Sequence, residues 1–224
     1  MNDLDFILNF EENKTKGIWL SGIEGEGTFV RYWDNGNLRD HCFWKNGKKH
    51  GECKEYNEDG ELWLHCFFKN GELHSECKEY YENGNLREHS FWENGKIHGE
   101  CKWYHKNGQL WEHCFYKNGD LHSEFKRYYE TGQLWEHSFW KNGNKHGECK
   151  LYYENGNLRE HSFYENDELH GESKLYYENG QLEEHSHWKN DKRHGECKWY
   201  HENGQILEHS FYENGNYIKD LMEK

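Results

Sequence analysis

The chain has 224 residues, of which 33% are hydrophobic, 17% aromatic and 31% charged, and it contains no proline. A mean hydropathy of -1.36 excludes a thick conventional core, yet the high aromatic content excludes a disordered chain. The formal charge of -14 argues against nucleic acid and anionic lipid as ligands, because both attract a basic surface.

The first residues, MNDLDFILNF, carry acids where a secretion signal carries basic residues, and no stretch reaches the apolar length of a membrane span. We therefore expect a cytoplasmic protein. Residues 1–26 resemble a degenerate copy of the repeat that follows, because Trp19 and Leu20 stand where a later copy has Phe43 and Trp44. They are predicted to form an N-terminal capping repeat, since terminal repeats cover an open edge.

Residues 27–218 repeat without interruption. A typical unit is GECKWYHKNGQLWEHCFYKNGDLH, from Gly99 to His122. Seven histidines share one spacing of 24 residues: His50, His74, His98, His122, His146, His170 and His194. Eight tandem repeats are predicted here, and residues 219–224 are predicted to be a charged C-terminal tail.

Each unit contains two turn signals, for example Asn107-Gly108 and Asn118-Gly119. Asn-Gly favours hairpins because its residues accept the positive φ that the turn requires. No segment has the apolar spacing of a crossover helix, so consecutive strands should pair as antiparallel neighbours. The predicted fold is all-β: an elongated single-layer antiparallel β-meander of tandem 24-residue hairpin repeats. Sixteen or so strands spaced by about 4.8 Å would extend about 75 Å.

Two registers are compatible with the first hairpin of each unit. A three-residue Glu-Asn-Gly loop places Tyr104 opposite Leu110 and Lys102 opposite Glu112. A two-residue loop instead places Cys53 opposite Cys66 and Cys101 opposite Cys114, within reach of a disulfide, and breaks every Lys/Glu pair. We favour the three-residue loop.

The favoured register makes further predictions. Glu79 faces Arg87, Trp103 faces Trp111 and Arg127 faces Trp135, and these are favourable cross-strand pairs. Across the second hairpin, Glu112 also faces Lys126. Phe115 then lies between Gly99 and Ser123, so that a ring covers a glycine. Arg31 opposite Arg39 is an unfavourable pair that this register does not explain.

One face of the predicted sheet carries Tyr and Leu around a Lys/Glu ladder, and the other carries Phe, Gly, Cys and His. The second face also holds a variable stripe that alternates cations with indoles: Arg87, Trp103, Trp111, Arg127 and Trp135. These side chains either fill space between strands or form a partner-binding surface. Trp and Arg are typical hot-spot residues, so the stripe is the candidate contact site.

Catalysis requires a few residues in a unique pocket, and here every candidate His, Glu and Cys is repeated along the chain. We expect no enzyme, no catalytic residue, no cofactor and no small-molecule substrate. A row of Cys53, His65, Cys77, His89, Cys101 and His113 would lie on one face, but its members are one strand apart and do not converge on a metal ion. No metal site is predicted. The eight cysteines occupy positions where other copies have Ser or Phe, which favours reduced thiols.

The strings YYENGNLREHSFWENGKIHGECKWY and YYENGNLREHSFYENDELHGESKLYYENG resemble the MORN-variant repeats of YwqK-like proteins, and most of all the copies in large DNA viruses of amoebae. The resemblance covers residues 27–218. It departs from the family pattern where Ser75 and Ser123 replace glycine and where His187 replaces an aromatic ring.

The resemblance implies a twisted single-layer sheet that mediates protein contacts or self-association, in the host cytoplasm or the virion if the source is viral. The expected function is therefore a non-enzymatic scaffold that binds a protein partner or itself. Two alternatives remain open: a peripheral membrane module, which the acidic charge disfavours, and an antitoxin-like inhibitor of an enzyme.

Overall fold

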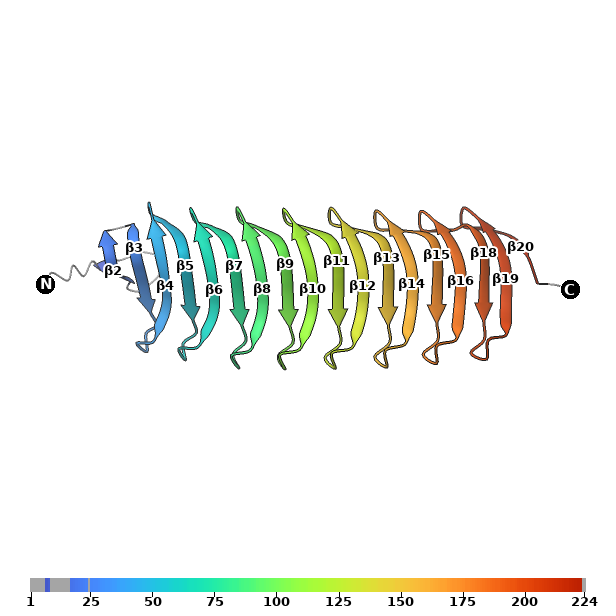
Figure 1. The fold of residues 1–224 in the computed structure, drawn as a ribbon, viewed down its shortest axis with the longest axis horizontal. Coiled ribbons are helices and arrows are strands. Elements are labelled where there is room, and N and C mark those ends of the chain that lie inside the picture. The colour runs from blue at the N-terminus through green and yellow to red at the C-terminus, as the bar shows by residue number, and fades with distance from the viewer. Residues whose placement is uncertain (1–6, 9–16, 24, 223–224) are drawn as a thin grey trace. The chain divides into compact units, whose positions relative to one another are not determined.

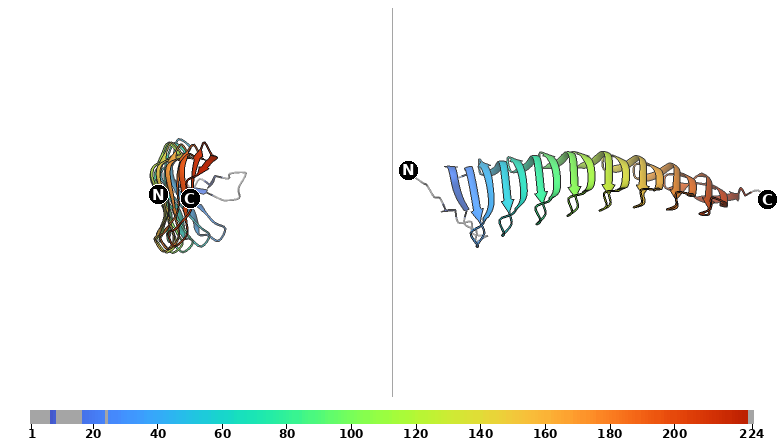
Figure 2. Two further views of the ribbon diagram at one scale, coloured as in Figure 1. Left: turned by 90° about the vertical axis from the view of Figure 1, so that its right-hand side faces the viewer. Right: turned by 60° about the horizontal axis from the view of Figure 1, so that its bottom comes forward.

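A computed structural model describes residues 7–8, 17–23 and 25–222. It confirms an all-β fold, because every regular element in these residues is a β-strand (Figure 1). The chain divides into two compact units, Met1–Gly108 and Gln109–Lys224. Within each unit consecutive strands pair antiparallel in a single layer, and Figure 2 shows no second layer over the described strands. No helix of the described residues is long and apolar enough to cross a membrane.

The described residues of the first unit form nine strands: β1 (Ile7–Leu8), β2 (Gly17–Ile23), β3 (Glu26–Tyr32), β4 (Leu38–Lys45), β5 (Lys48–Tyr56), β6 (Leu62–Lys69), β7 (Glu72–Tyr80), β8 (Leu86–Glu93) and β9 (Lys96–Tyr104). Of the predicted capping repeat, residues 1–6, 9–16 and 24 lie outside the described residues. Its described strand β2 pairs with β3, and the Trp19 ring packs 5.0 Å from Phe29.

The second unit contains the remaining strands: β10 (Leu110–Lys117), β11 (Asp120–Tyr128), β12 (Leu134–Lys141), β13 (Asn144–Tyr152), β14 (Leu158–Glu165), β15 (Glu168–Tyr176), β16 (Leu182–Lys189), β17 (Lys192–Arg193), β18 (Gly195–Tyr200), β19 (Ile206–Glu213) and β20 (Asn216–Asp220). Strand β20 includes the first residues of the predicted tail, and residues 223–224 lie outside the described part.

The two kinds of turn differ in their backbone. At the second turn of a repeat both central residues have positive φ, 54° at Asn70 and 89° at Gly71, as a two-residue hairpin requires. The first turn is longer: Tyr81 N donates to Asn85 O at 2.8 Å, and Gly84 has φ of 79°. The predicted three-residue Glu-Asn-Gly loop is therefore confirmed at the turn itself.

The predicted register is wrong one residue beyond that turn. Tyr80 lies opposite Leu86 as predicted, but Glu79 lies opposite Glu88, so Arg87 has no directly opposed residue and forms a β-bulge. The extra residue shifts the rest of the hairpin into the alternative register, with Cys53 opposite Cys66. A shift by one residue moves a whole strand's side chains to the other face, so the predicted Lys/Glu ladder does not form across the hairpin.

The second hairpin is also shifted. Glu112 lies opposite Arg127, not Lys126. Phe and Gly are neighbours across the second hairpin, because a Cβ at Gly147 would lie 3.6 Å from the Cβ of Phe139, but the Phe139 ring packs against His137, 5.2 Å between ring centres, and its stacking over the glycine stays a prediction. Gly147 also lies next to β14, across the first hairpin. There it faces Tyr164 and not Phe163, because the bulge of that hairpin shifts the register by one residue. Ser123 occupies the glycine position with φ of 78°.

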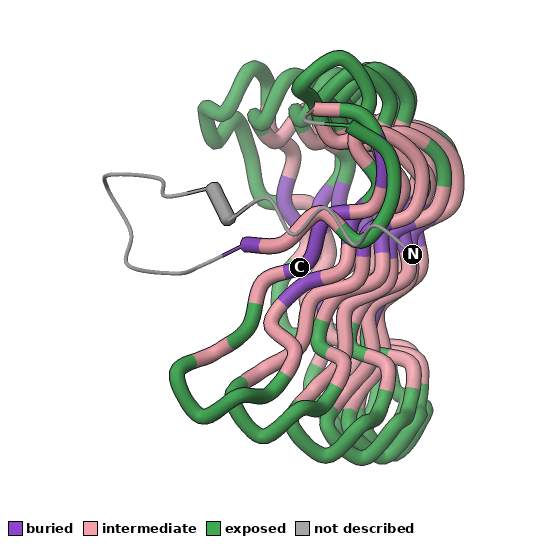
Figure 3. The backbone as a smooth tube through the Cα atoms, turned by 90° about the vertical axis from the view of Figure 1, so that its left-hand side faces the viewer, coloured by how far each residue is buried: buried purple, intermediate pink, exposed green. Residues whose placement is uncertain are grey.

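The actual register defines two faces. The small-residue face carries a buried row of Cys and Ser, and indoles lie over it: Trp92 Nε1 donates to Ser90 Oγ at 2.8 Å, and Trp140 Nε1 to Ser138 Oγ at 3.0 Å. Figure 3 shows the buried positions along the middle of the strands and exposed positions at the turns. The row therefore acts as a thin core.

The histidine face lies on the opposite side and carries Glu, Lys, His and Phe. In one repeat Glu76 Oε1 accepts from Lys78 Nζ at 2.7 Å and lies 2.8 Å from His89 Nε2. The centres of the His89 and Phe91 rings lie 5.1 Å apart. On this face the Lys/Glu contacts thus run between residues of one strand, two positions apart, as they also do for Lys126 and Glu124.

The expectation of reduced cysteines is wrong for four of them. Disulfides join Cys42 to Cys53 and Cys66 to Cys77, with Cα atoms 4.0 and 4.1 Å apart. Both bonds cross the second hairpin, where the two cysteines lie directly opposite each other on the small-residue face. The alternative register correctly places Cys53 opposite Cys66, but each of these cysteines is bonded to its other neighbour.

Candidate functional site

The bulged residues form a column whose residue type varies from repeat to repeat. Each first hairpin whose pairing lies inside one unit has its bulge at the same repeat position, which we call the bulge column: Arg39, Trp63 and Arg87 in the first unit, and Trp135, Arg159, Glu183 and Leu207 in the second. A bulge frees a residue from the sheet's alternation and redirects its side chain. The column can therefore vary without disturbing the ladder.

Two members of the column in the first unit are well exposed. Trp63 keeps 40% of its surface exposed, and the Arg87 side chain 57%. Arg87 Nη1 lies 3.5 Å from Glu79 Oε2, so the predicted contact between these residues is confirmed although they are not directly opposed. Burial raises the pKa of Glu79, and the charge of Glu88 raises it further.

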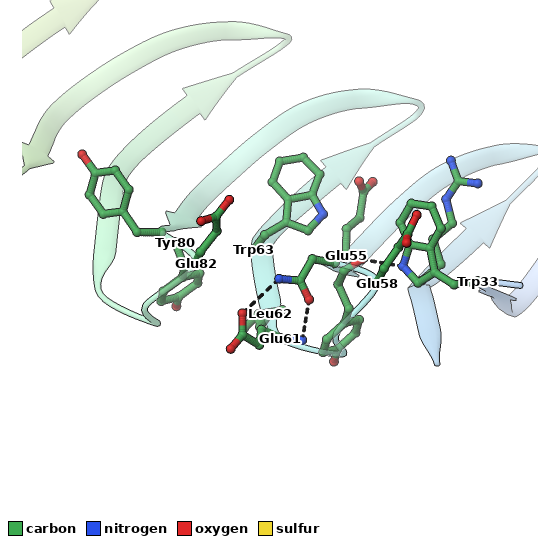
Figure 4. Close-up of a pocket in the computed structure, with 12 residues that line it drawn as sticks. Trp33, Glu55, Glu58, Glu61, Leu62, Trp63, Tyr80 and Glu82 are labelled. Carbon is green, nitrogen blue, oxygen red and sulfur yellow. Dashed lines mark hydrogen bonds between the residues drawn. The ribbon is translucent and has the colours of Figure 1, made fainter. Parts of the chain in front are cut away.

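A cleft of about 500 Å³ lies beside Arg39 and Trp63, between successive first turns (Figure 4). Its rings come from Trp33, Tyr56, Tyr80 and Tyr81, and its carboxylates from Glu55, Glu58, Glu61 and Glu82. Glutamate side chains therefore border the aromatic walls of the cleft, and Arg39 contributes a positive charge to its lining.

Contacts among the lining residues hold the walls of the cleft in place. The Arg39 guanidinium lies 4.6 Å from the Trp33 ring centre, and Trp33 Nε1 donates to Tyr56 O at 3.0 Å. Glu55 is paired with Lys49 at 2.9 Å. Glu58, Glu61 and Glu82 are exposed, so the charge presented at the rim is negative. Such a site suits a basic side chain, which aromatic faces and carboxylates both attract.

The predicted stripe falls in both units. Arg87 and Trp103 belong to the first, and Trp111, Arg127 and Trp135 to the second. Within the second unit the Arg127 guanidinium lies 5.8 Å from the Trp111 ring centre and 5.2 Å from that of Trp135, so these three residues do come together. The continuity of the stripe from one unit to the other stays a prediction.

Sequence reasoning missed Arg39 and Trp63, the bulge-column members that line the cleft. The signal was present, because they precede Arg87 by 48 and 24 residues in an uninterrupted 24-residue period.

The unexplained pair of Arg31 and Arg39 has a simple resolution. Because of the bulge, Arg31 lies opposite Asp40, and its Nε donates to Asp40 Oδ2 at 2.6 Å. Arg39 instead stacks on Trp33. Arg31 also lowers the pKa of Asp40, but burial is the larger influence and leaves that pKa raised.

The predicted row of cysteines and histidines does not exist as one row. His65 lies opposite Lys54 on the histidine face, whereas its neighbour Cys66 belongs to the small-residue face. Two groups of potential ligands occur among the described residues: Cys42, Cys53 and Glu55, whose cysteines are disulfide-bonded, and Glu172, His185 and His187.

The match to a protein-family model agrees with this geometry. The family model described as MORN repeat variant matches eight segments, residues 25–46, 49–70, 73–94, 97–118, 121–142, 145–166, 169–190 and 193–214, which confirms the predicted number of repeats. No curated protein matches the chain.

Among solved structures, a chain in the crystal structure of TcdB2-TccC3-Cdc42 is similar at 11% identity and a TM-score of 0.23. The match covers 92% of this chain and 14% of that one. The family model covers more than half of the sequence, and its eight segments follow the repeat seen in the strands. The chain therefore belongs to the MORN repeat variant family.

Proposed function

We propose that this protein is a non-enzymatic repeat scaffold that binds a protein partner through its bulge column and the cleft beside it. The observation that carries the proposal is the bulge itself. Because of the bulge, the variable residues Arg39, Trp63 and Arg87 have no directly opposed residue and take no part in the regular cross-strand pairing of the sheet. Side chains that vary while the framework repeats are what a recognition surface needs.

The chemistry of the cleft favours a partner segment that presents lysine or arginine. Trp63 offers an exposed indole, and Glu58, Glu61 and Glu82 offer carboxylates at the rim. The formal charge of -14 would speed the approach of a basic surface, and this effect weakens as salt is added. We propose that such a partner is met in the cytoplasm, or in a virion if the YwqK-like copies of large DNA viruses are the true relatives.

The test compares two single substitutions of equal exposure. Trp63→Ala removes the indole beside the cleft, and Phe43→Ala removes a ring that is 39% exposed on the histidine face. Proteins captured from cells that express the full chain are quantified for parent and both variants, with circular dichroism as the check on folding. Partners lost with Trp63→Ala and kept with Phe43→Ala support the cleft.

Self-association is a separate arm of the same experiment. Light scattering over a range of concentrations measures whether the parent assembles and whether Trp63→Ala abolishes this. If the parent and Trp63→Ala capture the same partners and show the same mass, the cleft is not the binding surface.

A further inference from the structure

One repeat departs from the others at a position that packs on the histidine face. Its residue is His187, where the corresponding residues of the other repeats are Phe43, Phe67, Phe91, Phe115, Phe139, Phe163 and Phe211. The substitution replaces an apolar ring with one that carries two nitrogen ligands.

His187 lies beside a second histidine. His185 and His187 are two residues apart on β16, so both side chains lie on the same face of the strand. Their ring centres are 5.3 Å apart at an interplanar angle of 43°. The same arrangement is formed by His161 and Phe163 one repeat earlier, at 5.1 Å and 46°. His187 therefore keeps the ring packing of the repeat and adds ligating atoms to it.

A carboxylate completes the group. Glu172 on β15 lies directly opposite His187, and its Oε1 lies 2.7 Å from His185 Nε2. One ligand atom from each of Glu172, His185 and His187 lies within 4.8 Å of the other two. His187 Nδ1 lies 3.3 Å from Glu196 O, a contact that would keep a proton on Nδ1 and leave Nε2 to bind an ion.

Two imidazoles and one carboxylate are the ligands that zinc and related divalent ions accept when the remaining positions are filled by water. The site is open to solvent, since 26% of the His185 side chain and 37% of the Glu172 side chain are exposed. Lys174 Nζ, 2.9 Å from Glu172 Oε1, is a competing cation that an ion would displace. The ion pair of Lys174 and Glu172 is partly exposed to solvent, and such pairs are weak enough for a metal ion to replace the lysine.

We infer that Glu172, His185 and His187 bind one divalent transition metal ion, and that Zn²⁺ is the ion to test. This site is distinct from the row of cysteines and histidines that sequence analysis rejected. It lies on the histidine face of the second unit and does not depend on the cleft of the first.

The repeats supply the controls. His187→Phe restores the residue that the other copies carry, so it should fold as the parent does. Zn²⁺ binding to the full chain is measured by titration calorimetry, and Co²⁺ absorption reports whether nitrogen and oxygen ligands surround the ion. We expect one ion per chain for the parent and a loss of affinity of more than about tenfold for His187→Phe.

A gain of binding is the second test. Phe163→His would add the missing ligand beside His161 and Glu148, whose side chains are already 2.8 Å apart. It should raise the stoichiometry from one ion to two. Unchanged Zn²⁺ affinity and stoichiometry in His187→Phe would overturn the inference. This outcome is expected if cysteine thiols bind the ion instead of Glu172, His185 and His187.

Discussion

The buried ion pair of Arg127 and Glu112 provides the sharpest test of the register. Arg127 Nη2 lies 2.7 Å from Glu112 Oε2 and its Nε donates to the same oxygen at 2.8 Å. Glu112 is 7% exposed, and the guanidinium also lies 5.0 Å from the Phe125 ring centre and 5.2 Å from that of Trp135. Arg127 thus neutralises a buried carboxylate and packs between rings.

Arg127→Met should lower the free energy of unfolding substantially. Removing one partner of a buried pair costs about 3–5 kcal/mol, because the other charge is left uncompensated. The Arg127 side chain is 29% exposed, so water can take part of its place. We therefore expect a loss of about 2–3 kcal/mol, including roughly 0.5–1 kcal/mol from the lost cation–π contacts.

The loss should depend on pH. Burial raises the pKa of Glu112, although Arg127 partly offsets this. A raised pKa in the folded state means that protonated Glu112 favours folding, so its contribution is present at low pH and lost as pH rises through the folded value. Without Arg127 the folded pKa rises further. The loss in Arg127→Met should therefore be smaller at pH 5 than at pH 8.

Urea denaturation followed by tryptophan fluorescence measures these differences. Arg87→Met is the matched control, because Arg87 is exposed and pairs with Glu79 at 3.5 Å, and it should change stability by less than about 0.5 kcal/mol. Adding Glu112→Gln to Arg127→Met should recover part of the loss, since no buried charge remains. Equal losses for Arg127→Met and Arg87→Met would refute the register and the burial of this pair.

Three further predictions concern the ladder, the backbone and the disulfides. Lys78 donates a hydrogen bond to Glu76, and this bond, together with a weaker one from His89, lowers the pKa of Glu76. Ionised Glu76 therefore stabilises the fold above the usual carboxyl pKa near 4.5, and this contribution is lost as pH falls through the lowered pKa. Lys78→Met should lower the thermal midpoint at pH 7 more than at pH 3, whereas Lys106→Met in an exposed turn should have no such pH-dependent effect. Ser75 has φ of 78°, so Ser75→Gly should raise the free energy of unfolding by about 1 kcal/mol in urea denaturation, whereas Ser90→Gly in the buried row should lower it. Reduction of the two disulfides, each closing a separation of 11 residues, should lower stability by up to about 3 kcal/mol per bond. Because the other four cysteines are buried, the check is alkylation of the denatured, unreduced chain, in which mass spectrometry should show four cysteines that stay unmodified.

The local rules of the repeat were predictable from the sequence. Most second turns carry Asn-Gly and every first turn ends in Gly, residues that accept the positive φ that the backbone needs there, as Gly71 and Gly84 show. The 24-residue period places these turns at regular intervals, and the absence of helical spacing leaves adjacent strands to pair with each other. The all-β fold, the antiparallel pairing and the eight repeats follow from these features alone.

Pairing across strands required the tertiary structure. The bulge at Arg87 depends on which backbone groups bond beyond the turn, and no residue type marks it in the sequence. The sequence alone therefore placed Lys78 and Glu88 on one face, whereas they lie on opposite faces. The bulge also places Arg31 opposite Asp40 and turns Arg39 and Trp63 towards the cleft. His187 was visible as a departure from the repeat, but Glu172 became its neighbour only through the register of β15 and β16.

What the sequence determined by itself is therefore the part of the fold that arises within a few residues of chain: turns, strands and their repeat. What the tertiary structure decided is which side chains share a face, because strand alternation has a period of two and one inserted residue exchanges the faces. The candidate binding column and the group around His187 depend on that single-residue shift, whereas the disulfide partners depend on the register of the second hairpin.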